Sequence, residues 1–190
     1  MPKIILASNS PRRKELLAGL ELDFEVRTMS GIDESYPADL RGEDIPTYIS
    51  QQKAKAYRPT LADDELLITA DTIVYLDHEV LGKPSNRDEA IHMLKALSGR
   101  RHDVITGVTL ATKTKSLSFA STTHVEFAQL SEADICHYVD VYRPFDKAGA
   151  YGIQEWIGYI GVRSIEGSYF NVMGLPVQRL SEALKVMYNS

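Results

Sequence analysis

The beginning of the chain constrains the fold most, because a short apolar run there passes directly into a helix start. Residues 4–7 read Ile-Ile-Leu-Ala, which is typical of a short buried strand, and leucines follow at helical spacing from residue 16 onward. Between the two, Ser10 is placed to cap a helix and Pro11 to be its first residue, where the missing N–H of proline does no harm. The sequence therefore predicts a strand that leads into the N-terminus of a helix.

Two arginines lie in the first turn of this predicted helix. Cations are unfavourable there for the helix itself, because the positive end of its dipole prefers anions. Arg12 and Arg13 are explained if an anion binds at this end, since free backbone N–H groups, hydroxyls and guanidiniums together make a phosphate site. The alternative is an ordinary capped helix with solvated arginines, and the sequence leaves both open.

Composition and charge narrow the class of protein. At 190 residues, with 44% hydrophobic and 25% charged residues, the chain suits one globular domain, and no apolar run approaches the roughly 20 residues of a membrane span. Residues 4–7 are too few for the apolar region of a secretory signal, and the single cysteine, Cys136, cannot form an internal disulfide. The net charge of −5 argues against a nonspecific nucleic-acid binder. We therefore expect a cytoplasmic protein without a nucleic-acid or membrane partner.

Strand-like and helix-like segments alternate along the chain. The predicted strands are residues 24–28, 66–76, 102–112 and 116–128, and the predicted helices are residues 46–57, 85–97, 131–143 and 177–188. Ser85 is expected to cap the second of these helices, and Lys113-Thr114 to turn between the last two strands. The order predicts an α/β fold with a mixed, strongly bent sheet flanked by helices, as a single domain over residues 1–190 without repeats or linkers.

Four loops are predicted between these segments, and the shortest of them is Leu81-Gly82-Lys83-Pro84. Residues 30–41 are polar, whereas residues 146–154 and 167–176 are rich in small residues that suit close backbone approach to a ligand. A plain glycine turn without a ligand is the alternative for the last two.

Asp71 lies in the middle of the apolar strand predicted for residues 66–76. Because burying an unpaired carboxylate is costly, it must face a partner, a metal or water; the alternative is an aspartate at a strand break or bulge. On the preceding helix, Lys53 shares a face with Ile49 and Ala56, so we expect its side chain to lie along the covered side.

Several common catalytic motifs are excluded. The Gly82-Lys83 pair is followed by proline and is not a Walker A loop, the five histidines lack zinc-ligand spacing, and no nucleophile elbow is present. What remains are carboxylates and cations: Asp33, Glu34 and Asp71, with Arg12, Arg13, Lys53 and Lys83. Carboxylates suit Mg²⁺ or Mn²⁺ and the cations suit phosphate oxygens, so the set favours metal-assisted hydrolysis of a phosphoanhydride.

Seven segments together resemble the Maf family of nucleoside triphosphate pyrophosphatases, and the match runs in order from residue 4 to about residue 185. They are Ser8-Asn9-Ser10-Pro11-Arg12-Arg13, Glu34, Gln52-Lys53-Ala54, Ala70-Asp71-Thr72, Gly82-Lys83-Pro84, residues 148–154 and residues 171–176. The resemblance implies a mixed α/β fold similar to the inosine triphosphatases, with two lobes, a central cleft and often a homodimer. It also implies hydrolysis of a nucleoside triphosphate to the monophosphate and pyrophosphate with a divalent cation, Mg²⁺ or Mn²⁺.

The resemblance also implies roles for single residues. Asp71 matches the proton acceptor, and Glu34 matches an acidic residue that holds the metal together with Asp71. The phosphate binders that match are Ser8, Ser10, Arg12, Arg13, Lys53 and Lys83. Arg13, Thr72 and Gln154 are the combination similar to the branch that prefers dTTP and UTP, and not to the 7-methyl-GTP branch. Asp33 receives no role.

The chemistry and the function each keep alternatives. An aspartate with a pKa of ~3.9 is a weak base at neutral pH, so either a metal makes the water more acidic or Glu34 raises the pKa of Asp71. For function, the alternatives to a pyrophosphatase of dTTP and UTP are a nucleotide-binding regulator of cell septation with little turnover, a pyrophosphatase for modified nucleotides, and a nucleic-acid-binding module that uses the arginines.

Overall fold

The computed structural model describes residues 2–189, which divide into two compact units. The first unit contains the described residues up to Thr72, residues 106–121 and the residues from Gly174 onward; the second contains residues 73–105 and 122–173. Three strands, β3 (Glu65–Leu76), β5 (Arg101–Ala111) and β6 (Ser116–Phe127), begin in one unit and end in the other. Neither unit is a continuous piece of sequence, and a single domain over residues 1–190 stays a prediction.

The strands form a mixed sheet. Their order is β2-β1-β3-β5-β6-β7, with β4 paired to β3. The short strands are β1 (Lys3–Leu6), β2 (Phe24–Val26), β4 (Glu79–Leu81) and β7 (Val162–Glu166). Strand β1 runs parallel to β2 and β3, whereas β4 is antiparallel to β3 and β7 to β6. This confirms the predicted mixed α/β fold.

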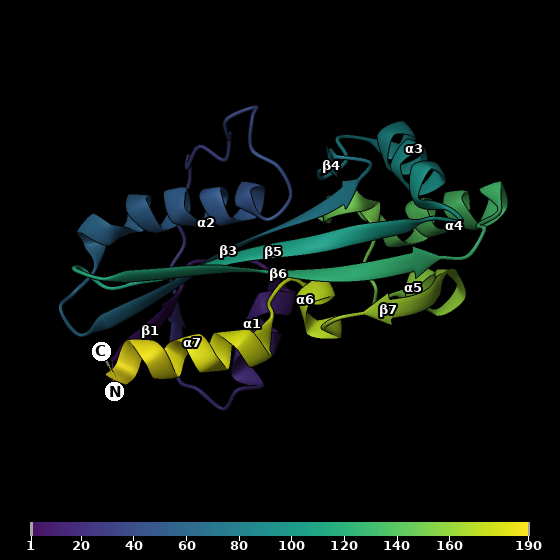
Figure 1. The fold of residues 1–190 in the computed structure, drawn as a ribbon. Helices are drawn as coiled ribbons and strands as arrows, with labels where there is room; N and C mark the ends of the chain where they lie inside the picture. The colour runs from purple at the N-terminus through teal and green to yellow at the C-terminus, as the bar shows by residue number, and fades with distance from the viewer. Residues whose placement is uncertain (1, 190) are drawn as a thin grey trace. The chain divides into compact units, whose positions relative to one another are not determined.

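In the first unit, helices cover both faces of the strands. Figure 1 shows α2 (Asp44–Tyr57) along one face, and α1 (Pro11–Ala18) and α7 (Val177–Asn189) on the other. Because strand side chains alternate between faces, Ile5 and Leu67 point to the side where Ala54 and Tyr57 of α2 complete a buried cluster. At Gly107 a Cβ would lie 2.3 Å from the Pro46 carbonyl carbon, so the glycine lets β5 approach the start of α2.

The second unit has a core of its own. Its helices are α3 (Arg87–Leu97), α4 (Glu132–Tyr142), α5 (Trp156–Gly161) and α6 (Tyr169–Met173). Helices α3 and α4 lie against one another (Figure 1), and Leu94, Phe127, Tyr138 and Ile157 are fully buried in one cluster. A 3-10 turn, η2 (Ala148–Ala150), lies in the predicted glycine-rich loop.

The prediction that Ser85 caps α3 is wrong by one residue. Asn86 takes the cap position, where its Oδ1 accepts the Glu89 N–H at 2.9 Å, while the Ser85 N–H donates to the Glu89 carboxylate at 2.7 Å. Both neighbours are good capping residues, and Glu89, three residues after Asn86, satisfies the spacing of a capping box.

The predicted loop over residues 167–176 contains a helical turn, α6. Its Asn171 side chain donates to the Val104 carbonyl at 3.1 Å and to the Thr123 hydroxyl at 3.0 Å. These bonds to β5 and β6 fix the turn, and no local sequence pattern predicts them. The elements β4, α5 and β7 were also not predicted.

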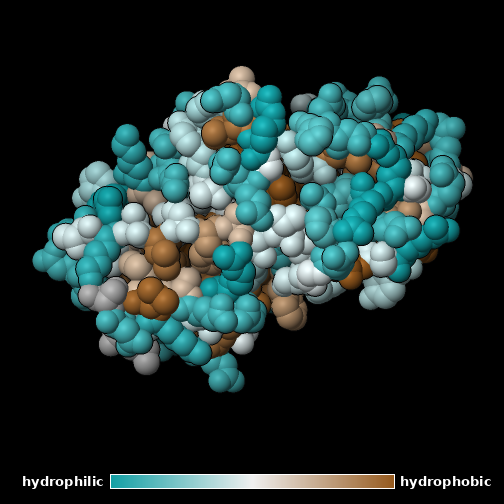
Figure 2. Space-filling model, in the orientation of Figure 1, coloured by the Kyte–Doolittle hydropathy of each residue, from teal (hydrophilic) through white to brown (hydrophobic). Residues whose placement is uncertain are grey.

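The surface is mixed in character. Hydrophilic residues cover most of the face seen in Figure 2, and apolar residues occupy smaller areas between them. Such a surface is ordinary, because polar atoms cannot cover a folded chain completely. None of the helices within residues 2–189 has the length and apolar character of a membrane span.

Candidate active site

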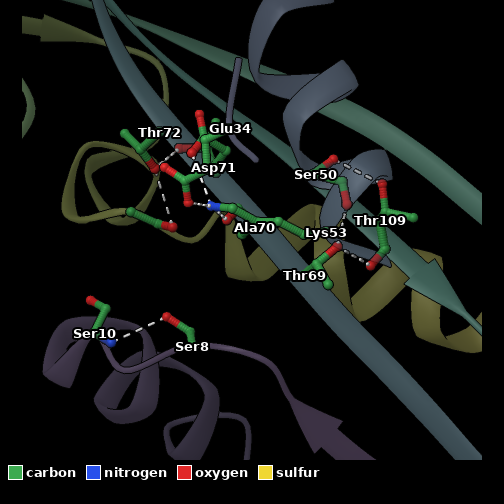
Figure 3. Close-up of polar contacts among 12 residues, drawn as sticks. Ser8, Ser10, Glu34, Ser50, Lys53, Thr69, Ala70, Asp71, Thr72 and Thr109 are labelled. Atoms are coloured by element: carbon green, nitrogen blue, oxygen red, sulfur yellow. Dashed lines mark hydrogen bonds and ion pairs between the residues drawn. The ribbon is translucent and has the colours of Figure 1, made fainter. Parts of the chain in front are cut away.

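The loop between β1 and α1 is shaped by its two serines. Ser10 caps α1 as predicted: its backbone is extended, and its hydroxyl accepts the Arg13 N–H at 3.3 Å. The buried Ser8 hydroxyl accepts the Ser10 N–H at 3.2 Å (Figure 3). In both bonds the serine hydroxyl is the acceptor. Its own O–H group can still donate a hydrogen bond to an anion. Arg12 follows in the same first turn, half-buried.

The Arg13 side chain ties this loop to two distant segments. Its Nε donates to the Gly174 carbonyl at 2.8 Å, Nη1 to the Ala70 carbonyl at 3.2 Å and Nη2 to the Thr72 hydroxyl at 3.0 Å. Burial lowers the pKa of Arg13, whereas the Asp71 carboxylate acts in the opposite direction. Arginine stays charged in proteins, so Arg13 supplies a fixed positive charge, with three of its five N–H groups bonded within the first unit.

Thr72 is in direct contact with Arg13. Besides accepting from Arg13, its Oγ1 lies 2.9 Å from the Thr106 hydroxyl and 3.5 Å from the Gly174 carbonyl oxygen. Two of the three predicted specificity residues therefore form one hydrogen-bonded pair beside Asp71.

Asp71 lies on β3 opposite a lysine from α2. Strand β3 runs unbroken through this residue, and Lys53 Nζ lies 3.1 Å from Asp71 Oδ1 and 3.2 Å from the Ala70 carbonyl oxygen. The side chains of Lys53 and Asp71 are each 14% exposed, which confirms that Lys53 lies along the covered side of its helix. The carboxylate thus has a charged partner in a continuous strand, as an aspartate in an apolar strand requires.

The same ammonium group binds a second carboxylate. Lys53 Nζ lies 3.0 Å from Glu34 Oε1 in the loop after β2, and the Glu34 side chain is 56% exposed. Figure 3 shows Glu34 and Asp71 converging on Lys53. The predicted base and the predicted metal ligand are therefore neighbours, joined by a cation that a phosphate oxygen could also bind.

These two carboxylates fit a metal ion that the substrate helps to hold. Residues 2–189 contain no group of three or more His, Cys, Asp or Glu side chains that could hold a metal by themselves. Mg²⁺ normally takes one or two protein carboxylates and completes its shell with substrate phosphates and water. Glu34 and Asp71 meet that requirement.

Lys83 and Gln154 belong to the second unit. The loop that carries Lys83 is held beside the glycine-rich loop, because the Gly149 N–H donates to the Gly82 carbonyl at 3.1 Å. Gln154 is exposed on a turn closed by a bond of 3.0 Å from the Glu155 N–H to the Gly152 carbonyl. The other predicted site residues lie in the first unit.

Sequence reasoning missed the acceptors that position these charges. The carbonyls of Ala70 and Gly174 and the hydroxyl of Thr106 bind Arg13, Lys53 or Thr72 across long stretches of sequence. Backbone carbonyls carry no residue-specific signal, so the chain offers no pattern from which to find them.

Comparison with known proteins identifies the family of the whole chain. Residues 3–187 match a family model described as Maf-like protein. The chain is 63% identical to a dTTP/UTP pyrophosphatase of Phocaeicola vulgatus over 183 residues, 96% of this chain and 95% of that protein. It is 61% identical to a dTTP/UTP pyrophosphatase of Bacteroides thetaiotaomicron, with the same coverage. Among solved structures, a HAM1 protein from Coxiella burnetii is similar over 68% of this chain and 75% of that one, with a TM-score of 0.44 at 18% identity. Since the family model and the two dTTP/UTP pyrophosphatases match nearly the whole sequence, the chain belongs to the family of Maf-like proteins.

Proposed function

We propose that this protein hydrolyses dTTP and UTP to the nucleoside monophosphate and pyrophosphate. Relatives with 63% and 61% identity over almost the full chain bear the name dTTP/UTP pyrophosphatase. The observation that carries the proposal is the Asp71 carboxylate on β3, held 3.1 Å from Lys53 Nζ with Glu34 on the same ammonium group.

In the proposed reaction Asp71 accepts the proton of the attacking water. General-base catalysis of this kind contributes roughly 10²- to 10⁴-fold. A Mg²⁺ or Mn²⁺ ion held by Glu34 and Asp71 would lower the pKa of a bound water and neutralise phosphate charge. We favour this source of basicity over repulsion from Glu34, because the ammonium group of Lys53 stands between the two carboxylates.

The cations of the site bind the triphosphate in this proposal. Lys53 exchanges its carboxylate partners for phosphate oxygens, and the charge on the departing pyrophosphate is stabilised by fixed positive groups. The other proposed phosphate contacts are Ser8, Ser10, Arg12, Arg13 and Lys83.

Base selection is proposed to rest on Gln154, Arg13 and Thr72. The amide of Gln154 offers a donor and an acceptor, which match the O4 and N3–H edge of uracil or thymine. Arg13 can only donate, which suits O4 and disfavours the amino group of cytosine. Thr72 holds Arg13 in place through its hydroxyl.

Four further expectations stay part of this proposal. They are the strongly bent sheet, the two lobes with a cleft that the family resemblance implies, a homodimer, and a cytoplasmic location.

A screen of nucleoside triphosphates with Mg²⁺ or Mn²⁺, with identification of the products, tests the proposal. We expect dTTP and UTP to be the best substrates and pyrophosphate to be released. Release of orthophosphate would mean cleavage of the terminal bond and would contradict the proposal. Nucleotide binding without turnover would favour the septation regulator, and a modified pyrimidine triphosphate with a higher kcat/KM would favour the modified-nucleotide alternative.

A further inference from the structure

The turn that carries the exposed Gln154 is anchored by buried residues before it and by a backbone hydrogen bond. Tyr151, Gly152 and Ile153 are buried, whereas the next residue, Gln154, is exposed. The bond of 3.0 Å from the Glu155 N–H to the Gly152 carbonyl closes the turn over residues 152–155. The position of the Gln154 amide therefore depends on what holds Gly152 and Glu155.

A single hydroxyl group binds both ends of this turn. Tyr138 is fully buried on α4, and its hydroxyl accepts the Gly152 N–H at 3.0 Å. The same hydroxyl donates to Glu155 Oε1 at 3.1 Å. Burial raises the pKa of Tyr138, so its hydroxyl stays protonated and can make both bonds at neutral pH.

A lysine completes the arrangement around the Glu155 carboxylate. Lys147 Nζ lies 3.2 Å from Glu155 Oε1 and 3.0 Å from Asp146 Oδ1, and its side chain is 14% exposed. A neutral donor and a cation thus hold the same carboxylate oxygen, Oε1, and a rotation of the carboxylate would move this oxygen away from both.

Gly152 leaves the space that this arrangement needs. A Cβ at that position would lie 2.5 Å from Glu155 Oε1 and 2.9 Å from Lys147 Cε. Any side chain there would push the carboxylate away from its two partners, so the close approach is built into the sequence of the loop.

We propose that Tyr138 is a positioning residue for base recognition: by holding Gly152 and Glu155 it fixes where Gln154 places its amide. The inference rests on the proposed function, in which Gln154 reads the pyrimidine. A buried tyrosine that merely satisfies its hydroxyl would affect stability alone, so base selectivity separates the two roles.

The test compares two tyrosine-to-phenylalanine variants of the second unit. Tyr138→Phe removes the hydroxyl that binds the turn. Tyr151→Phe is the matched control, since this buried tyrosine lies in the same loop but its hydroxyl bonds to His102 Nε2 at 2.6 Å. The measurements are kcat/KM for UTP and CTP, the inhibition constant of inorganic tripolyphosphate, which has no base, and the melting temperature.

We expect Tyr138→Phe to lower the ratio of kcat/KM for UTP over CTP by about tenfold or more, because displacing a binding group by 1 Å costs up to about 10²-fold. The change should lie mainly in KM, and the inhibition constant of tripolyphosphate should stay within twofold. Tyr151→Phe should lower the melting temperature to a similar extent while keeping the base ratio within twofold.

A second pair of variants covers the case in which Tyr138→Phe does not fold. Glu155→Ala should reduce the base ratio, and Glu155→Gln, whose amide oxygen still accepts from Tyr138, should restore most of it. The inference is overturned if Gln154→Glu changes the base ratio but neither Tyr138→Phe nor Glu155→Ala does. If the wild-type protein hydrolyses neither dTTP nor UTP, the proposed function fails, and the inference fails with it.

Discussion

Two clusters, one in each unit, share the same arrangement of charges: a lysine between two carboxylates. The first consists of Lys53 with Glu34 and Asp71, and the second of Lys147 with Asp146 and Glu155. Both lysine side chains are 14% exposed, and all four ion pairs measure between 3.0 and 3.2 Å. Charge and distance alone do not distinguish them.

The clusters differ in what else binds the carboxylates. Glu155 also accepts the Tyr138 hydroxyl, which closes the second cluster around the turn over residues 152–155. In the first cluster, Asp71 and Glu34 share the ammonium group of Lys53, and Asp71 is held in place by its strand. In the proposed reaction, a metal ion and phosphate oxygens take over these ion pairs. We infer that the first cluster is built for exchange of partners and the second for fixed geometry.

Removal of divalent metal should give the largest loss of activity of the changes considered. It should act through the first cluster and not through the second. A chelator should abolish turnover, because only the Glu34 and Asp71 pair is proposed to hold the ion, and added Mg²⁺ or Mn²⁺ should restore it. Pyrophosphate release with UTP measures this. The melting temperature of the nucleotide-free protein should not change with the chelator, and full turnover in its presence would contradict the metal assignment.

Asp71→Asn should give the next largest effect, a loss of kcat between about 10²- and 10⁴-fold. The amide keeps the shape of the side chain but cannot accept a proton. The variant should remain folded by circular dichroism and still bind UTP by calorimetry. Asp146→Asn is the matched control, because it neutralises a carboxylate bound to Lys147 in the second cluster. It should keep most of kcat; equal losses in both variants would place the base elsewhere.

Lys53→Met and Lys147→Met remove the lysine of one cluster each, and we expect them to change different kinetic constants. Lys53→Met removes a fixed positive charge from the proposed phosphate site, so we expect kcat to fall by about 10²-fold. Without the ammonium group, the two carboxylates should also bind Mn²⁺ more tightly in the nucleotide-free protein, which electron paramagnetic resonance measures directly.

Lys147→Met should act instead on the ratio of kcat/KM for UTP over CTP, because Glu155 loses one of the groups that fix the turn. A drop in kcat from this variant as large as that from Lys53→Met would show that the clusters do not differ as inferred.

Local patterns predicted the parts of the molecule that depend on neighbouring residues. Ser10 caps α1 as its position before proline indicates, and Lys53 lies on the covered face of α2 as its spacing indicates. The position of Asp71 in an apolar strand predicts that its carboxylate faces a partner, a metal or water. Lys53, 18 residues earlier, is that partner.

The parts that were missed depend on distant contacts. Tyr138 lies 14 residues before Gly152, and nothing in the sequence of α4 distinguishes this tyrosine from its neighbour Tyr142. The α6 turn is fixed by bonds from the Asn171 side chain to β5 and β6. Such choices are settled by tertiary packing, which one sequence does not display.

Gln154→Glu should give the smallest loss, and it tests whether the turn held by the second cluster reads the base. The new carboxylate removes the amide donor and adds a charge, so kcat/KM for UTP and dTTP should fall by about tenfold, while the products stay the same because Asp71 is untouched. Gln51→Glu adds the same charge at an exposed position of α2 and should leave the ranking of bases unchanged. The dependence of kcat on pH should keep its shape in both variants, since neither alters the first cluster. If the wild-type protein hydrolyses 7-methyl-GTP best, or if Gln154→Glu leaves the ranking of bases unchanged, then Gln154 does not select the base, and the second cluster fixes a turn without a part in specificity.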